Sequence, residues 1–124
     1  MSKSYKGGAD ILDQMVEAIE KIELYVRNTD ESDFLTQQES FDAICMQFAL
    51  LGELTNNLDD SADNIIRNFP EEVNWSALIG LRNRISHNYV SVDPTLIWQF
   101  ATTEITDIKE SLIRLLKKRY GRRQ

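Results

Sequence analysis

The chain has 124 residues, of which 42% are hydrophobic and 27% charged, and its formal net charge is −6. This length suits one domain with its own hydrophobic core. No apolar run approaches the roughly 18 residues that span a bilayer, and the first residues lack the apolar segment of a signal peptide. The single cysteine provides no disulfide framework. We therefore expect a cytoplasmic protein without a membrane span.

Positive charge gathers at the end of the chain. Residues 109–124 hold seven Lys or Arg and one Glu, a local balance of +6, so residues 1–108 carry −12. An acidic body binds nucleic acid poorly without a specific site, although a local basic patch can contact phosphates. Cations also stabilise the carboxyl end of a terminal helix. Both interpretations of this segment stay open.

The first half of the chain shows helical periodicity. Residues 9–28 are predicted to form a helix, because apolar residues recur there three or four positions apart. The polar segment 28–33 is predicted to be a loop. Thr36 to Glu39 has the form of a capping box, which predicts a second helix from about Gln37 to Asn57. Cys45 lies beside the apolar side of that helix and is interpreted as a small buried hydrophobic residue.

The second half of the chain contains clearer sequence signals for where helices begin. A short helix capped by Asp60 or Ser61 is expected within residues 58–68, and residues 69–73 form a connector because Pro70 disfavours helix in its predecessor. Asn74 is a plausible N-cap for a third helix, residues 75–88. Asp93 followed by Pro94 predicts the start of a fourth helix, which extends to about Tyr120.

These patterns predict an all-α fold, an antiparallel four-helix bundle with one short extra helix. One domain covers residues 1–124, with residues 1–8 and 121–124 frayed. No strand, internal repeat or interior domain boundary is predicted.

One stretch, residues 81–89, concentrates the reactive side chains and holds the only histidine. A single Cys and a single His argue against a structural zinc site. The imidazole of His87 can transfer a proton in either direction near neutral pH. The guanidinium of Arg82 stays charged and matches phosphate oxygens. With the RNA 2′-hydroxyl as internal nucleophile, this pair needs neither metal nor cofactor.

Helix geometry limits how these two side chains can cooperate. At about 100° per residue, His87 lies about 140° around the helix from Arg82, so one copy cannot easily aim both at one phosphate. Two copies related by a two-fold axis can each line a shared cleft. Gly80, Asn83 and His87 share the side opposite the apolar residues, and Gly80 permits a close backbone approach there. The catalytic interpretation therefore predicts a homodimer with the third helix at the seam.

A simpler interpretation stays open. In it His87 stabilises the carboxyl end of its helix, while Arg82 and Arg84 are merely exposed.

The motif Arg82-x4-His87-x-Tyr89 resembles the Arg-x(4–6)-His signature of HEPN ribonucleases, in the extended form of the HepT-like (DUF86) toxins. Residues 51–53 and 75–84 also resemble that family, and the likeness covers most of the chain. The resemblance implies a homodimeric, metal-independent endoribonuclease that acts as the toxin of a toxin–antitoxin pair.

The resemblance also implies roles for individual residues. Arg82 and His87 correspond to the catalytic pair, and three polar neighbours line the cleft or bind RNA phosphate: Asn83, Arg84 and Ser86. Tyr89 corresponds to the tyrosine that an MntA-like minimal nucleotidyltransferase antitoxin modifies with AMP.

Two other functions remain possible from the sequence. The first is a non-catalytic HEPN module that binds a nucleotidyltransferase partner or a nucleotide in the same dimer cleft. The second is a helical interaction protein whose basic tail contacts RNA or ribosomes, in which Arg122 and Arg123 would matter more than His87.

Overall fold

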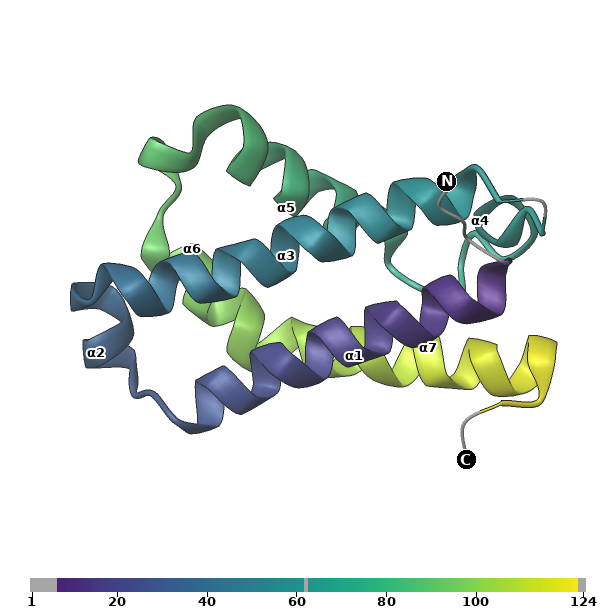
Figure 1. Ribbon diagram of the computed structural model, residues 1–124, viewed down its shortest axis with the longest axis horizontal. Coiled ribbons are helices and arrows are strands. Elements are labelled where there is room, and N and C mark those ends of the chain that lie inside the picture. Colours follow the sequence, from purple (N-terminus) through teal and green to yellow (C-terminus); the bar gives the residue numbers. More distant parts are fainter. Residues whose placement is uncertain (1–6, 62, 123–124) are drawn as a thin grey trace.

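The computed structural model describes residues 7–61 and 63–122, and every regular element among them is helical (Figure 1). The long helices are α1 (Gly8–Arg27), α3 (Gln38–Asp59), α5 (Trp75–Asn88) and α7 (Ile105–Tyr120). Shorter elements are α2 (Glu31–Thr36), α4 (Ile65–Asn68), the 3₁₀ turn η1 (Tyr89–Ser91), α6 (Pro94–Gln99) and the π-helical η2 (Phe100–Glu104). The predicted all-α fold is confirmed.

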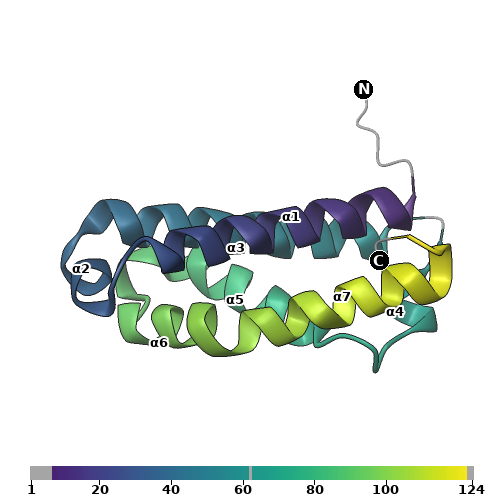
Figure 2. The same ribbon diagram turned by 90° about the horizontal axis from the view of Figure 1, so that it is seen from below.

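The helices enclose one hydrophobic core. Helix α3 packs against both α5 and α1, and α1 also packs against α7. Seen from below, α1 and α3 form one layer, and α6 and α7 form the other (Figure 2). The largest fully buried side chains come from several helices and include Phe34, Phe48, Met15, Leu51 and Leu78. Within the described residues, none of the helices has the length and apolar character that a bilayer span requires.

The start of α5 confirms the predicted cap. The side chain of Asn74 accepts a hydrogen bond from the backbone N–H of Ala77 at 3.2 Å. The indole N–H of Trp75 donates to the carbonyl of Phe69 at 3.0 Å, which ties the first turn of α5 to the preceding connector. Local chemistry in the sequence therefore fixes where this helix begins.

The fourth predicted helix is also present, with an irregular interior. Asp93 caps it by accepting from the N–H of Thr95 at 3.0 Å. The helix continues to Tyr120, but η2 interrupts the α-helical pattern. The hydroxyls of Thr102 and Thr103 donate to carbonyls one turn earlier, and such bonds from threonine bend helices.

The predicted capping box before α3 is wrong. Residues 31–36 form α2, half of which was expected to be loop, and Asp30 caps this helix by accepting from the N–H of Asp33 at 2.8 Å. The hydroxyl of Thr36 donates back to the carbonyl of Ser32 within α2, so it does not cap α3. Gln37 is the N-cap of α3 and makes no side-chain cap bond.

The caps expected for the short helix after α3 are wrong as well. Helix α3 extends to Asp59, so Asp60 and Ser61 follow its carboxyl end. The short helix α4 begins only after Asn64, whose φ of 52° lies in the left-handed region that asparagine tolerates.

Of the termini expected to fray, residues 1–6 and 123–124 lie outside the described part. Gly8 is the first residue of α1 and is buried. Gly121 ends α7 in a left-handed conformation with φ 67°. The guanidinium of Arg122 forms ion pairs with Asp13 and, at 3.6 Å, with Asp10 of α1.

A polar cluster joins the first and last long helices of the chain at one end of the bundle. A carboxylate oxygen of Asp63 accepts from the N–H of Gly8 at 2.9 Å and from the hydroxyl of Tyr120 at 2.5 Å. These two bonds, the Tyr120 bond above all, hold the pKa of Asp63 below its usual range. Burial, reinforced by the bond to Asp63, raises the pKa of Tyr120. The cluster therefore links α1, the segment before α4, and α7.

Removing the Tyr120 hydroxyl should weaken this link. We expect Tyr120→Phe to lower the free energy of unfolding by about 1 kcal/mol at neutral pH, because Asp63 loses a donor. The folded-state pKa of Asp63 is lowered, so its contribution holds above the ordinary value of 3.8 and is lost as the pH falls further. The folded-state pKa of Tyr120 is raised, so its contribution holds below 10.0 and is lost as the pH rises.

Urea denaturation at acidic, neutral and alkaline pH measures this effect, and the difference between wild type and Tyr120→Phe should be largest at neutral pH. Tyr25→Phe is the matched control, because Tyr25 is exposed and its hydroxyl makes no hydrogen bond among the described residues. Equal losses in the two variants would contradict the prediction.

Candidate functional site

Helix α5 holds the motif on a surface that the other described residues leave open. It buries four apolar residues, Trp75, Leu78, Leu81 and Ile85, and its main contact is with α3. It lies at the edge of the bundle (Figure 1). The side chains expected to line a cleft, Asn83, Arg84 and Ser86, are all exposed.

Arg82 is fixed against α3 by a close approach of the two helices. A Cβ at Gly52 would lie 2.0 Å from the Cβ of Arg82, so only glycine leaves room for the arginine stem. The Nη2 atom of Arg82 lies 3.1 Å from a carboxylate oxygen of Glu53, and its Nη1 donates to the side-chain oxygen of Asn83 at 3.2 Å. The side chain remains 30% exposed. Arg82, Asn83 and Glu53 therefore form one polar cluster.

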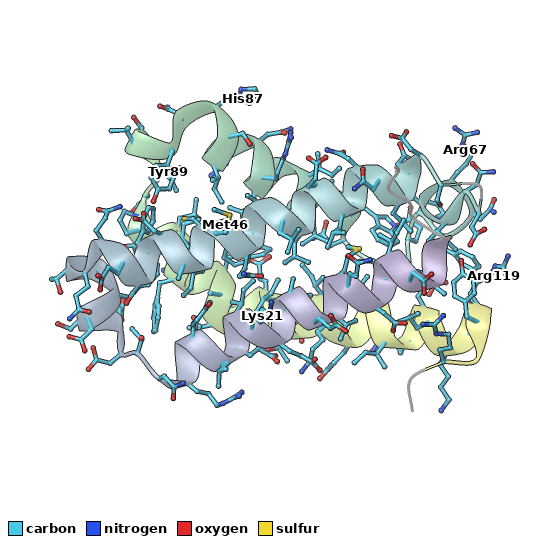
Figure 3. All side chains as sticks on the ribbon, in the orientation of Figure 1. Lys21, Met46, Arg67, His87, Tyr89 and Arg119 are labelled. Atoms are coloured by element: carbon cyan, nitrogen blue, oxygen red, sulfur yellow. The ribbon has the colours of Figure 1, made fainter. Side chains whose placement is uncertain are left out.

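His87 stands apart from that cluster. Its side chain is exposed in the last turn of α5 and points away from the bundle (Figure 3). Among the described residues no hydrogen bond links His87 or Ser86 to another side chain, and none joins His87 to Arg82. One copy of the chain therefore leaves the imidazole free to contact another molecule.

Arg84 lies on the side of α5 away from Arg82. It lines two shallow grooves between α5 and α6, of about 230 and 220 Å³, and both grooves also include Leu96. No ion-pair partner of Arg84 occurs among the described residues. The two arginines of the motif thus face different surfaces, as their spacing of two residues requires.

Tyr89 begins η1 and turns toward α3 (Figure 3). Its ring packs against Phe41 with centroids 5.5 Å apart, and its hydroxyl accepts from Nε2 of Gln38 at 3.4 Å. The same Nε2 donates to Asp42 at 2.8 Å. The tyrosine is 36% exposed, so its hydroxyl lies near the surface, on a different side of the motif from His87.

Cys45 is buried, which confirms its interpretation as a core residue. Burial, and to a lesser degree the charge of Asp42, raises the pKa of its thiol to about 12. The thiol is therefore protonated at neutral pH and is a poor nucleophile. Within residues 7–61 and 63–122, no three His, Cys, Asp or Glu side chains gather as metal ligands.

Two contacts of the motif were not found by sequence reasoning. Glu53 contacts Arg82 across 29 positions of sequence, and Gln38 contacts Tyr89 across 51. The signal for Glu53 was its neighbour Gly52, since a glycine inside a helix often marks a close packing contact. Nothing in the local sequence distinguished Gln38 from Gln37.

The basic end of the chain is partly neutralised by the acidic body. Lys109 pairs with Glu23 at 2.8 Å, Lys118 pairs with Glu72 at 3.1 Å, and Arg122 pairs with α1. Arg123 lies outside the described residues. Part of the terminal positive charge therefore stabilises the bundle.

Comparison with known proteins places the chain in a family. The family model described as "Ribonuclease HepT-like" matches residues 15–115. The chain belongs to the ribonuclease HepT-like family. The helical bundle described above is therefore that of a HepT-like protein.

Curated relatives agree with this assignment. "Probable ribonuclease HepT" of Thermococcus cleftensis is 27% identical over 117 residues, which cover 94% of this chain and 100% of the relative. "Gamma-glutamylcyclotransferase and putative RNase" of Methanocaldococcus jannaschii is 26% identical over 107 residues, which cover 86% of this chain and 46% of that relative. A "Putative RNase" of the same organism is 23% identical over 103 residues, 83% of this chain and 87% of the relative. No solved structure matches the chain significantly.

The contact between α3 and α5 can be tested with a single methyl group. Gly52→Ala should lower the free energy of unfolding by about 1–3 kcal/mol, because the new Cβ overlaps the stem of Arg82. Gly80→Ala on α5 is the matched control. Nothing lies within 4 Å of a Cβ there, so this change should raise stability by up to about 1 kcal/mol.

Denaturation of both variants in urea, at a protein concentration low enough to avoid association, separates the two effects. A Gly52→Ala variant as stable as Gly80→Ala would show that the helices do not approach so closely.

Proposed function

We propose that this HepT-like protein is an endoribonuclease that cleaves RNA without a metal. The observation that carries the proposal is an exposed histidine and a fixed arginine on the open side of α5, in a chain of the ribonuclease HepT-like family. The relatives named as ribonucleases support the same chemistry.

In the proposed reaction His87 acts as general acid and base. The RNA 2′-oxygen attacks the adjacent phosphorus as it loses its proton to an imidazole. The bond from phosphorus to the 5′-oxygen breaks, and a proton passes to that oxygen. The products are a 2′,3′-cyclic phosphate and a free 5′-hydroxyl.

Arg82 stabilises the charge that develops on the phosphate oxygens, usually the largest catalytic term. Its present partner, Glu53, is an exposed carboxylate. Exposed ion pairs contribute only about 0–1 kcal/mol, whereas a guanidinium binds phosphate through two parallel hydrogen bonds. A bound RNA phosphate can therefore displace Glu53 from Arg82.

We further propose that the active site forms in a homodimer across α5. Two observations support this. Arg82 and His87 do not meet in one chain, and Gly80 faces open space within a helix that is covered on only one side. A two-fold axis beside α5 would bring Arg82 of one copy toward His87 of the other.

The first test is RNA cleavage in excess EDTA by wild type and by His87→Ala. We expect cleavage by wild type and a loss of at least about 100-fold in the variant, because a general acid/base contributes 10²–10⁴-fold. Because His87 is exposed, the variant should stay folded. If wild type cuts no RNA although Tyr89 is unmodified and the dimer is intact, the nuclease proposal fails.

A mixing experiment tests the shared site. Arg82→Ala and His87→Ala should each be inactive alone. After subunit exchange, each mixed dimer contains one cleft with an intact arginine and an intact histidine, so the mixture should regain roughly a quarter of wild-type activity. No recovery, with mixed dimers detected by mass spectrometry, would mean that both groups act from one chain.

We also propose that the protein is the toxin of a toxin–antitoxin pair, neutralised at Tyr89 by an MntA-like minimal nucleotidyltransferase. The tyrosine oxygen would attack the α-phosphorus of ATP, so that an O–P bond forms and pyrophosphate leaves. The support is position, because the Tyr89 hydroxyl is near the surface two residues from His87 and, among the described residues, has a single long hydrogen bond. The added AMP would bring bulk and negative charge beside the cleft.

Tyr89→Phe tests this regulation. We expect the variant to keep cutting RNA when the nucleotidyltransferase and ATP are added, whereas wild type loses activity and gains the mass of an adenylyl group. Tyr25→Phe, altered at another exposed tyrosine, should lose its RNA-cleaving activity as wild type does. Equal silencing of Tyr89→Phe would place the modified residue elsewhere.

The alternative is a non-catalytic module that binds a nucleotidyltransferase or a nucleotide in the same cleft. One observation favours it. Arg82, which would bind the RNA phosphate, is already paired with Glu53 and so is not free for catalysis in this state. The cleavage test separates the two functions. A role centred on the basic tail has less support, because Arg122 is held by Asp10 and Asp13.

A further inference from the structure

A pocket of about 430 Å³ opens where α2, the start of α3 and the segment after α5 meet. Its lining includes Phe34, Thr36, Gln37, Gln38, Phe41 and Tyr89, and none of its lining residues is charged. The volume falls within the range of about 300–1,000 Å³ that suits small organic ligands. A neutral lining does not suit a phosphate group or a metal ion.

Aromatic rings form the apolar wall of this pocket. The ring centroids of Phe34 and Phe41 lie 5.8 Å apart, and those of Phe41 and Tyr89 lie 5.5 Å apart. Phe34 and Phe41 are buried and hold the wall in place, whereas Tyr89 leaves part of its ring exposed. Exposed aromatic rings are platforms on which single-stranded nucleic acids stack their bases.

Polar groups of the pocket suit the edge of such a base. Both hydrogens of the Gln38 amide are directed to neighbours, Asp42 at 2.8 Å and Tyr89 at 3.4 Å, so its Oε1 remains as an acceptor. The side chain of Gln37 makes no hydrogen bond among the described residues and offers both a donor and an acceptor. Nucleobases present this combination of a neutral aromatic face with donors and acceptors on the edge.

We propose that this pocket binds one nucleobase of the RNA, adjacent to the bond that is cut. The inference rests on the proposed ribonuclease function and adds a specificity site to it. Tyr89 links the two regions along the backbone, because it lines the pocket and follows the motif histidine by two residues. The base enters the neutral pocket while its phosphate stays outside it.

A titration followed by NMR tests the pocket without any cleavage. The probes are the four nucleoside 5′-monophosphates, added to uniformly ¹⁵N-labelled wild type. We expect amide shifts at residues 36–38 and 89–92 with the nucleotides and none with ribose 5-phosphate, which has the same charge but no base. Equal shifts with ribose 5-phosphate, or no shifts at these residues with any nucleotide, would overturn the proposal. Stronger binding of N-acetyl-tyrosinamide would overturn it in favour of an aromatic side chain of a partner protein.

Gln38→Leu tests the role in specificity, since it keeps the size of the side chain and removes its hydrogen bonds. We expect the affinity for the preferred nucleotide to fall about 2- to 10-fold, as for the loss of one hydrogen bond, and the preference for the base beside the cut to weaken. Gln14→Leu, at an exposed glutamine of α1, is the control and should change neither.

The two readouts separate this inference from the proposed function. RNA cleavage with no nucleotide shifts at the pocket, or with an unchanged base preference in Gln38→Leu, overturns the inference and leaves the nuclease intact. Nucleotide shifts at the pocket without cleavage by wild type overturn the nuclease and leave a base-binding site.

Discussion

The close contact between α3 and α5 is the constraint on which the rest of the site depends. At Gly52 the two helices approach so closely that the stem of Arg82 takes the space of a side chain. Because α5 packs mainly against α3, this contact determines how closely α5 approaches the bundle and which of its sides faces outward. Glycine thus acts here through the absence of Cβ. It allows an arginine to lie flat against a neighbouring helix and still reach the surface.

The helical twist of α5 directs the side chains of the motif to several different surfaces. Arg82 lies toward α3, Arg84 toward α6, and His87 away from the bundle. The spacing that identifies the motif in sequence therefore separates its groups in one copy of the fold. A reaction that needs both the guanidinium of Arg82 and the imidazole of His87 at one phosphate therefore needs a second copy of the chain. For this motif, catalysis would depend on dimer formation.

Sequence reasoning succeeded where the signals were local. Asn74 and Asp93 cap their helices as predicted, because a cap depends on residues within one turn. It failed where tertiary contacts decide. Thr36 had the residue pattern of a capping box, but its hydroxyl bonds back into α2.

The candidate site shows the same division. The exposure of the residues around His87 follows from the apolar side of α5, which the sequence reveals. The contacts of Glu53 and Gln38 with the motif were not predicted, since contacts across 29 and 51 positions depend on how helices cross. The π-helical η2 was also missed. Its apolar residues fit an ordinary helix, and the packing of Phe100 on Phe48, with ring centroids 5.5 Å apart, is a contact that the local sequence does not reveal.

The one-sided support of α5 has a thermodynamic consequence. Any molecule that covers the open side of this helix and binds only the native state stabilises that state, by an amount that grows with the logarithm of its concentration. A second copy, an RNA or a partner protein would each act in this way. The stability of the native state is therefore a property of the chain together with its surroundings, and it depends on the concentration of the molecule that covers α5.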